Sequence, residues 1–321
     1  MAEVRLAKVR ASEFSTSEKD PLRWAADWKA SAATSRRIGI HTSIAGGVEN
    51  AAERAFRLGC NTFQIFSTSP RQWRPYSLGR SQCEAMSELR RRYDLKPLVI
   101  HSNYLINLAG TNSGFLKKSI AAFRGEAERG LALCAEYLVL HPGSFRGGGR
   151  EEGLARTAAS IAEACSGLDL AAGGLTILVE NTAGAEYSLG GTFEQVAELL
   201  ELLRAHVPVG ACIDTCHTHV AGYDIVTPEG RALTLRHLGE TVGLENVRVW
   251  HCNDAKAERG SRLDRHEHIG RGRLGLDVFR ALLNDRRLKH AAFIAETPID
   301  DPGDDLRNVE ALKGAVGRRS R

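Results

Sequence analysis

Eight short apolar runs recur along this chain, and they constrain its fold more than any other feature of the sequence. Their ends lie about 25 to 45 residues apart, and each run is almost continuously apolar, as expected for a parallel strand buried on both faces. The runs are Ile38–His41, Thr62–Phe66, Leu98–His101, Tyr137–His141, Leu175–Glu180, Val209–Asp214, Val247–His251 and Ala292–Glu296. The pattern predicts a sheet of parallel strands.

Segments with apolar residues at helical spacing lie between these runs. They are Glu49–Leu58, Ser119–Ala135, Glu151–Cys165, Thr192–Ala205 and Leu276–Asn284. Eight β-then-α units in about 280 residues are typical of an α/β fold, the (β/α)8 TIM barrel, which takes about 250 residues. A doubly wound open sheet is the alternative. No G-x-G-x-x-G fingerprint follows the first run, however, and eight units are many for that class.

The predicted barrel occupies residues 38–315. Residues 1–37 form a polar extension that we expect to lie outside the barrel, partly helical or disordered, and residues 316–321 form a basic C-terminal tail. The chain has seven Cys and no C-x-x-C pair, which favours a reducing compartment. No apolar run approaches the roughly 18 residues that span a bilayer, and the N-terminus lacks the apolar core of a secretory signal. We therefore expect a cytoplasmic protein, or a nuclear or mitochondrial one in a eukaryote.

The residues that end the runs are the strongest functional signal. They are His41, Phe66, His101, His141, Glu180, Asp214, His251 and Glu296, so all except one are of a type that binds metal. The C-terminal ends of barrel strands surround one active-site mouth, so these side chains are predicted to converge there. A single histidine could simply be a hydrogen-bonded strand end, but crowded ionisable groups repel and desolvate one another. Divalent metals would resolve that conflict.

Two local patterns extend the set. His217 follows Asp214 by three residues, and Asp264 and His266 lie two apart in a loop. The candidate ligands are then His101, His141, Glu180, Asp214, His217, His251, Asp264, His266 and Glu296. Imidazoles and carboxylates without a required thiolate suit a catalytic zinc cluster, or zinc with manganese at one site. The set is too large for one tetrahedral ion and could serve three if carboxylates bridge.

Longer motifs carry a family resemblance over residues 38–315. The most specific stretches are HSNYLINLA from His101, GACIDTCH from Gly210, and HCNDAKAERGSRLDRH from His251 followed by EHIGRG from Glu267. Weaker support comes from HTSIAGG at 41–47, SPRQW at 69–73, HPGS at 141–144, VENTAG at 179–184 and ETP at 296–298. On these motifs the chain resembles the endonuclease IV family of apurinic/apyrimidinic (AP) endonucleases, which are zinc enzymes of DNA base-excision repair.

The resemblance implies a specific division of the ligands among three zinc ions. His101, His141 and Glu180 would hold the first ion. Glu180 would bridge to a second ion, which Asp214, His251 and Glu296 would also hold. His217, Asp264 and His266 would hold the third. His41 is not a ligand in the family pattern and is expected to form hydrogen bonds behind the ligands.

The resemblance also implies a zinc-dependent phosphodiester hydrolase that acts on duplex DNA. It would cleave 5′ to an abasic site and leave a 3′-hydroxyl and a 5′-deoxyribose phosphate, with 3′-phosphodiesterase activity in addition. Bound metals supply a nucleophile and charge stabilisation in such reactions, and Glu296 and Glu180 are the expected catalytic carboxylates. A sugar isomerase or epimerase on a similar divalent-metal barrel is the alternative. It needs strand-end ligands too, but not the third set.

Recognition of an abasic site needs side chains that enter the duplex. The resemblance assigns this role to Arg71, Tyr104 and Leu105. From the residues alone, the segment 104–106 would be read as the buried start of the third helix. Phosphate contacts are expected from loop residues, namely Arg74, Lys256, Arg262 and Arg265.

The charge balance fits this reading only when metals are counted. The formal net charge is +4, too weak to identify a nucleic-acid-binding protein by itself. Three divalent ions would add about six positive charges at the mouth. A mouth that must admit DNA also favours a monomer.

Overall fold

Strands and helices alternate along the chain in the computed structural model, which describes residues 34–73 and 76–317. The barrel strands are β1 (Arg37–Ile40), β2 (Phe63–Phe66), β3 (Leu98–His101), β4 (Tyr137–Leu140), β5 (Thr176–Glu180), β6 (Val209–Asp214), β7 (Val247–His251) and β10 (Ala292–Ala295). All pair in parallel in the order β1-β10-β7-β6-β5-β4-β3-β2. Each lies within one residue of the position predicted from its apolar run.

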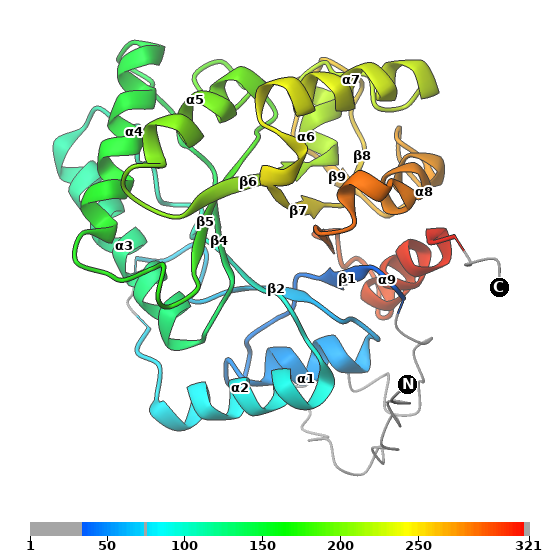
Figure 1. Ribbon diagram of the computed structural model, residues 1–321, viewed down its shortest axis with the longest axis horizontal. Helices are drawn as coiled ribbons and strands as arrows, with labels where there is room; N and C mark the ends of the chain where they lie inside the picture. The colour runs from blue at the N-terminus through cyan, green and yellow to red at the C-terminus, as the bar shows by residue number, and fades with distance from the viewer. Residues whose placement is uncertain (1–33, 74–75, 318–321) are drawn as a thin grey trace.

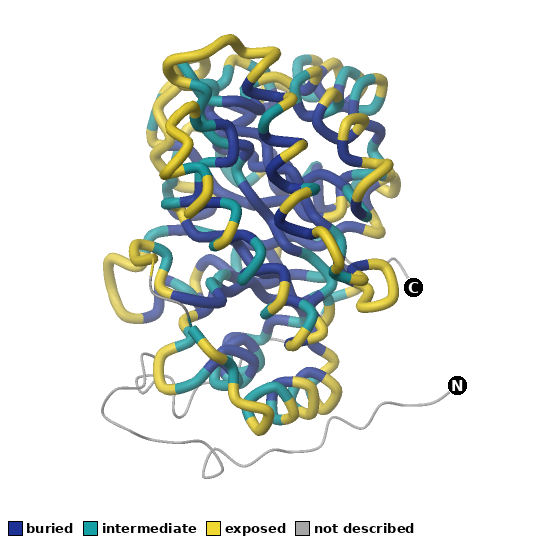
Figure 2. Tube along the Cα trace, turned by 90° about the vertical axis from the view of Figure 1, so that its left-hand side faces the viewer, coloured by how far each residue is buried: buried dark blue, intermediate teal, exposed yellow. Residues whose placement is uncertain are grey.

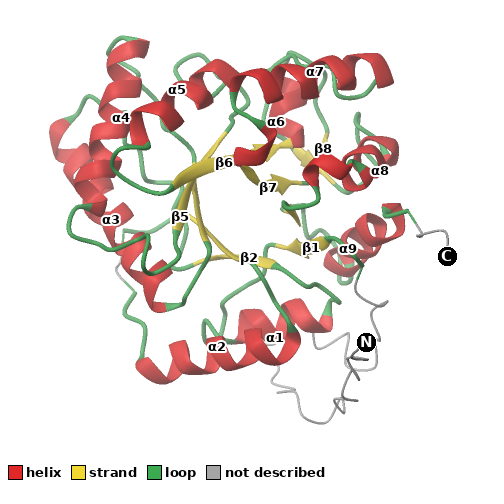
Figure 3. Ribbon diagram, in the orientation of Figure 1, coloured by secondary structure: helices red, strands yellow, loops and turns green. Residues whose placement is uncertain are grey.

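The two ends of this sheet meet and close it into a barrel. A parallel bridge joins His41 to Gln64, and the Thr42 amide donates a hydrogen bond of 2.8 Å to the Gln64 carbonyl. The strands consequently form a ring with helices outside it (Figure 3). The prediction of a single TIM barrel is confirmed, and the open doubly wound sheet is excluded.

Helices cover the outside of the ring (Figure 1). They are α1 (Asn50–Arg57), α2 (Arg80–Tyr93), α3 (Ser113–Ala132), α4 (Arg150–Cys165), α5 (Phe193–Leu203), α6 (Thr215–Val220), α7 (Pro228–Thr241), α8 (Leu276–Asn284) and α9 (Asp304–Ala315). Two short 3-10 turns, η3 (Leu244–Asn246) and η4 (Arg286–Leu288), precede β7 and β10. Sequence periodicity identified α1, α3, α4, α5 and α8 but not the others.

Side-chain caps set the starts of several helices. Asn112 accepts a hydrogen bond from the Phe115 amide at the start of α3, and Thr192 does the same at α5. Thr227 caps α7, and Pro228 occupies its first turn, where a missing N–H costs nothing. The Asn112 cap explains why α3 begins before Ser119, the predicted start.

Apolar side chains fill two layers. A large cluster packs between the strands and the helices, and a smaller one fills the space inside the ring. The buried chain therefore follows the strands and the inner helix faces, while exposed segments lie on the outer loops (Figure 2). The two layers hold the strand ends, and hence the mouth, in fixed positions.

The predicted boundaries fall close to the ends of the described chain. β1 begins at Arg37, one residue before the expected edge of the barrel, and α9 ends at Ala315. Most of the predicted extension (1–33) and most of the predicted tail (318–321) lie outside the described residues. Among the described helices, none has the length and apolarity needed to cross a membrane.

Candidate metal centre and active site

Nine candidate ligands gather at the C-terminal mouth of the barrel. Those predicted at strand ends are either the last residue of β3, β5, β6 or β7, or the first residue after β4 or β10. Their candidate ligand atoms form three sets, and within each set the atoms lie within 4.8 Å of one another. The sets are His101, His141 and Glu180; Glu180, Asp214, His251 and Glu296; and His217, Asp264 and His266.

Glu180 is the centre of this arrangement. Its side chain is fully buried, and one carboxylate oxygen lies 3.1 Å from His101 Nε2 and 3.2 Å from His141 Nε2. The other oxygen lies 3.0 Å from His251 Nδ1. A carboxylate that presents one oxygen to each of two groups of imidazoles has the geometry of a bridge between two cations.

The charges around Glu180 favour its ionised form. Burial by itself would raise the pKa of this carboxyl, but His251 and His141 and the hydrogen bond from His101 outweigh burial and hold the pKa well below its usual value. Glu296 behaves alike, because His251 and His101 outweigh burial and lower its pKa to about 2. The mouth therefore holds anionic carboxylates that are stabilised by positive charge.

The third set is held by local structure. Asp214 caps α6 by accepting a hydrogen bond of 2.8 Å from the His217 amide, which fixes His217 relative to the end of β6. Asp264 and His266 come from a two-stranded hairpin, β8 (Asp254–Ala255) and β9 (His266–Glu267): Asp264 lies in its loop and His266 begins β9. The Asp264 carboxylate lies 3.2 Å from His217 Nε2 and 3.1 Å from His266 Nε2.

A buried carboxylate at the start of that hairpin binds the segment that follows it. The Asp254 carboxylate is fully buried and accepts hydrogen bonds from the Gly270, Leu274 and Gly275 amides at 3.0, 2.8 and 3.2 Å. Burial lowers the pKa of His266, but the nearby carboxylates of Asp264 and Asp214 outweigh burial and raise it to about 9. This set also stabilises positive charge.

The second nitrogen of three of the rings faces a backbone carbonyl. Nδ1 of His101 lies 2.8 Å from the Ser102 carbonyl, Nδ1 of His217 lies 2.9 Å from the Asn181 carbonyl, and Nδ1 of His266 lies 3.0 Å from the Glu296 carbonyl. A carbonyl can only accept, so each Nδ1 donates its proton, and each Nε2 is the nitrogen that would present a lone pair to a metal in the mouth. Metal-binding histidines are oriented in this way.

In the third set, a buried ring nitrogen lacks a well-formed hydrogen bond. His266 Nε2 has no hydrogen-bond partner of acceptable geometry, although carboxylate oxygens of Asp264 and Asp214 lie 3.1 and 3.7 Å away. An imidazole nitrogen that faces two carboxylates at these distances fits a shared cation better than a direct pair. The donor set therefore fits divalent metal ions.

Thiols near the ligands are poorer donors. Cys212 and Cys216 lie close enough to join alternative sets. Burial raises the pKa of both thiols to about 12, so both are protonated at neutral pH. In the metal-free site, imidazoles and carboxylates are thus the more readily available donors.

The mouth is open on one side. The side chain of His141 is 37% exposed and that of Asp264 is 49% exposed, whereas Asp214 and His251 are fully buried. A substrate can therefore approach the first and third sets from solvent. Burial lowers the pKa of His41 to about 4, so this ring is neutral, and it lies behind Glu296 at 4.0 Å.

The residues predicted to enter DNA lie on two adjoining loops at this mouth. Arg71 is exposed in the loop after β2, and Tyr104 is 57% exposed in a turn after β3. Asn103 joins the loops, because its Nδ2 donates hydrogen bonds of 2.8 and 2.9 Å to the Ser69 and Gln72 carbonyls. The segment 104–106 is not the start of α3, which begins at Ser113, and Leu105 is only partly buried.

The predicted phosphate-contacting residues gather beside the third set. Lys256, Arg262 and Arg265 are exposed on the loop between β8 and β9, which also carries Asp264. Arg74 lies outside the described residues. The loop therefore places positive charge next to the exposed part of the candidate site.

The sequence motifs did not identify two asparagines that hydrogen-bond to the candidate ligands. The Asn253 amide donates a hydrogen bond of 2.6 Å to Asp214, and its oxygen accepts one of 2.7 Å from the Glu296 amide. Asn181 accepts a 2.7 Å hydrogen bond from the Asp214 amide. The sequence did carry one signal for them: Asn181 directly follows the strand-end ligand Glu180, and Asn253 lies two residues after His251.

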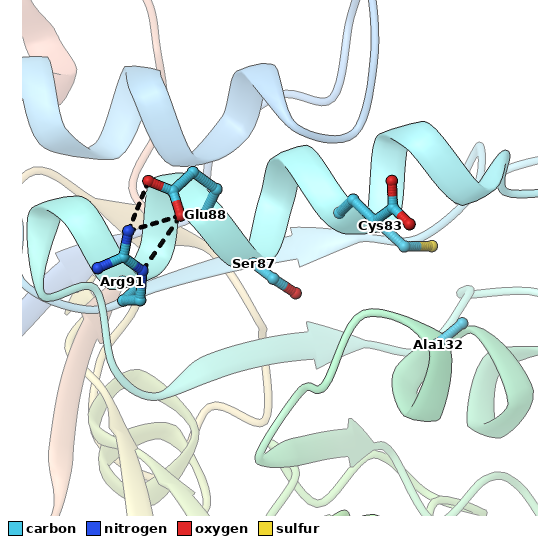
Figure 4. Close-up of a pocket in the computed structure, with 6 residues that line it drawn as sticks. Cys83, Ser87, Glu88, Arg91 and Ala132 are labelled. Atoms are coloured by element: carbon cyan, nitrogen blue, oxygen red, sulfur yellow. Dashed lines mark hydrogen bonds and ion pairs between the residues drawn. The ribbon is translucent and has the colours of Figure 1, made fainter.

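A groove elsewhere on the surface has no such chemistry. It lies between α2 and the end of α3, lined by Cys83, Ser87 and Ala132, with Glu88 and Arg91 paired at 2.8 Å (Figure 4). Burial raises the pKa of the Cys83 thiol, so it is not an activated nucleophile. The mouth of the barrel remains the candidate active site.

Comparison with known proteins first defines the class. Residues 52–315 match the family model described as a xylose isomerase-like TIM barrel. Among solved structures, endonuclease IV from Thermus thermophilus superposes with a TM-score of 0.76 at 39% identity, covering 87% of this chain and 98% of that one. A D-tagatose 3-epimerase-like protein has a TM-score of 0.64 at 20% identity, which is a likeness of fold alone.

Curated relatives then define the family. A protein named probable endonuclease 4 from Solibacter usitatus is 48% identical over 88% of this chain and 98% of its own length. Another of the same name from Chloroflexus aurantiacus is 43% identical over 87% and 98%. The chain belongs to the endonuclease 4 family.

Proposed function

We propose that this chain is an AP endonuclease that hydrolyses the phosphodiester 5′ to abasic sites in duplex DNA, leaving a 3′-hydroxyl and a 5′-deoxyribose phosphate. The observation that carries the proposal is the gathering of three donor sets around the buried Glu180 at an open mouth. Membership of the endonuclease 4 family directs that chemistry to nucleic acid. The same site would remove 3′-blocking groups, which are also phosphate esters.

We further propose three zinc ions, one for each donor set. His101, His141 and Glu180 would hold the first. Glu180, Asp214, His251 and Glu296 would hold the second, and His217, Asp264 and His266 the third. Bound divalent ions lower the pKa of water and neutralise the charge that develops on phosphate oxygens.

The chain's own residues have distinct parts in this reaction. Glu180 offers one oxygen to each of two donor sets and thereby fixes their separation. Glu296 is ionised and only partly buried, so its carboxylate can orient the attacking water and accept its proton. Asn253 fixes Glu296 by accepting its backbone N–H. The exposed Lys256, Arg262 and Arg265 would contact the phosphates on either side.

The two loops beside the mouth suit damage recognition. An abasic site lacks one base, so unstacking costs little there and side chains can fill the gap. The half-exposed Tyr104, with Leu105 and the exposed Arg71, would fill it. Asn103 holds the two loops together, so these side chains are presented as one unit.

Replacing Tyr104 by alanine is expected to raise KM for an abasic duplex by about tenfold, because a stacked aromatic contributes roughly 1–3 kcal/mol per base. The kcat should stay within about threefold, since Tyr104 is in none of the donor sets. Steady-state cleavage of a labelled duplex measures both. Leu233→Ala, an exposed apolar residue on α7, is the matched control. Equal KM values for the two variants would refute the wedge assignment.

One cleavage assay tests the function itself. The protein is incubated with two labelled duplexes that differ only in one abasic analogue, and the products are separated by length. Cleavage 5′ to the analogue, with the undamaged duplex intact, is the expected result. Failure to cleave, together with epimerisation of a free ketose, would favour the sugar epimerase alternative, for which the fold alone gives support.

We also propose that the protein acts as a cytoplasmic monomer. The exposed side of the mouth must remain open for a duplex to reach the donor sets. Sedimentation of the metal-loaded protein, with and without an abasic duplex, measures the number of chains in each complex.

A further inference from the structure

The barrel interior beneath the ligands is apolar, with one exception. Six residues, each placed two positions before a candidate ligand on its strand, form a contiguous buried cluster. They are Val99, Val139, Leu178, Cys212, Val249 and Ile294. Residues two apart on a strand share a face, so this cluster is the layer on which the ligands stand. On β2 the residue that pairs with Val99 of this layer is polar instead: it is Gln64, which is fully buried.

A buried amide is costly unless its hydrogen bonds are made, and Gln64 makes them to the candidate site. Its Nε2 lies 2.5 Å from Glu296 Oε1 and 3.1 Å from His41 Nδ1, and its Oε1 lies 2.8 Å from His251 Nε2. One side chain thus reaches two members of the second donor set.

The chemistry of these partners fixes the orientation of the amide. An ionised carboxylate only accepts hydrogen bonds, so the group that faces Glu296 must be the NH2 of Gln64. The amide oxygen then faces His251, whose Nε2 must carry the proton. In the neutral ring that binds a metal, Nδ1 would then present its lone pair to the site, where it lies 3.0 Å from Glu180 and 3.2 Å from Glu296.

Three of the other ligand histidines are oriented by backbone carbonyls. His101, His217 and His266 each donate from Nδ1 to a carbonyl and present Nε2. His251 is reversed, because it presents Nδ1 and is held through Nε2 by a side chain. Within the described chain, the hydrogen bonds of the His251 ring are made to side chains and not to backbone carbonyls. Substitution of Gln64 therefore removes a constraint on the His251 tautomer that no backbone carbonyl replaces.

The first strand lies close beside the strand that carries Gln64. β1 lies between β2 and β10, so Gln64 has to reach past β1 to contact residues of β7 and β10. Gly39 on β1 has no side chain, and a Cβ there would lie 2.0 Å from the Thr62 carbonyl oxygen. The close approach of β1 to β2 at Thr62, two residues before Gln64, thus depends on one glycine.

We infer that Gln64 is a positioning residue for the second donor set, which selects the Nδ1-presenting tautomer of His251 and fixes the rotamer of Glu296. This inference rests on the proposed function. An apolar residue of similar size would leave His251 free to present either nitrogen, and a glutamate would place a second negative charge beside Glu296.

Two variants of one interior layer test this. Gln64→Leu keeps the volume of the side chain and removes its hydrogen bonds. Val99→Ala is the control: it loosens the packing at the β3 residue that pairs with Gln64, and it removes no hydrogen bond to a ligand. For Gln64→Leu, kcat should fall about 30-fold with KM unchanged, and zinc should pass to a chelator about tenfold faster. Val99→Ala should lower the Tm but leave kcat and zinc release within about threefold.

Other outcomes overturn the inference. Wild-type kcat and zinc release in Gln64→Leu would do so, as would equal losses in Val99→Ala, because packing alone would then explain them. Gln64→Glu should not restore activity, since the donor to Glu296 is still missing. If every Gln64 variant unfolds while Val99→Ala folds, the role is structural and the inference fails. Zinc release remains informative if the wild-type protein cleaves no abasic duplex, so the two proposals fail separately.

Discussion

Glu180→Gln is expected to reduce cleavage of an abasic duplex by about 10⁴-fold, which corresponds to about 5.4 kcal/mol of transition-state stabilisation. The carboxylate contacts three imidazoles at 3.0–3.2 Å and is shared by two donor sets. The glutamine side chain has the same shape, but it offers only one oxygen, and its NH2 group repels a cation. Single-turnover kinetics and metal analysis of the purified variant measure the loss.

A second buried carboxylate provides the control. Glu126 on α3 is also almost fully buried, but it pairs with Arg129 at 3.1 Å and accepts a hydrogen bond from Ser67, outside the donor sets. Glu126→Gln should lower the Tm and retain both metal content and kcat. A Glu180→Gln protein that is fully metallated and active would remove the basis of the assignment.

Removal of metal is expected to abolish cleavage and to destabilise the fold. Prolonged dialysis against a chelator should release three ions per chain, and zinc should restore activity. Ligands bound at a thousand times their Kd stabilise a protein by about 4 kcal/mol, so the Tm should fall measurably in the apo form. The physical reason is that Glu180, Asp214 and Glu296 then share one mouth without divalent counter-charge.

The metal count also separates the alternatives. Three ions per chain fit the three donor sets, whereas one or two would fit a sugar isomerase. Val99→Ala should keep the wild-type count, which controls for losses caused by looser packing. An apo protein that cleaves as fast as the metal-loaded one would contradict the proposed mechanism.

The barrel and most of the candidate ligands could be predicted because two strong regularities coincide. Buried parallel strands are read as apolar runs, and the last residues of those runs necessarily meet at one mouth. His101, Glu180 and His251 were located in this way. His217 and His266 required local spacing, which the cap at Asp214 and the β8–β9 hairpin explain.

The helix α2 could not be predicted because its buried face is narrow. On α2 only Met86 and Arg90 are buried, and the remaining residues are mostly polar, so no apolar periodicity marks the helix. Arg90 is buried because its guanidinium pairs with Glu136 at 2.5 Å on a distant segment. A long-range ion pair of this kind has no signature in the sequence around either residue.

The same limit applies to the groups behind the ligands. Gln64 interrupts an apolar run, which marks it as unusual but does not name its partners. Those partners, His251 and Glu296, lie at the ends of β7 and β10, which approach Gln64 on β2 only when the barrel is closed. Asn253 and Asn181 likewise act through contacts between strands.

The pairing of the first strand with the last has a consequence for synthesis of the protein. β1 pairs with β10, so the ring cannot close before the strand that begins at Ala292, the partner of Arg37, has been synthesised. Domains of this kind of topology acquire their long-range contacts late, after most of the chain has been made. His101, His141 and Glu180 can approach one another on a growing chain, but Glu296 arrives near the end. A ribosome-bound fragment should therefore be inert toward DNA.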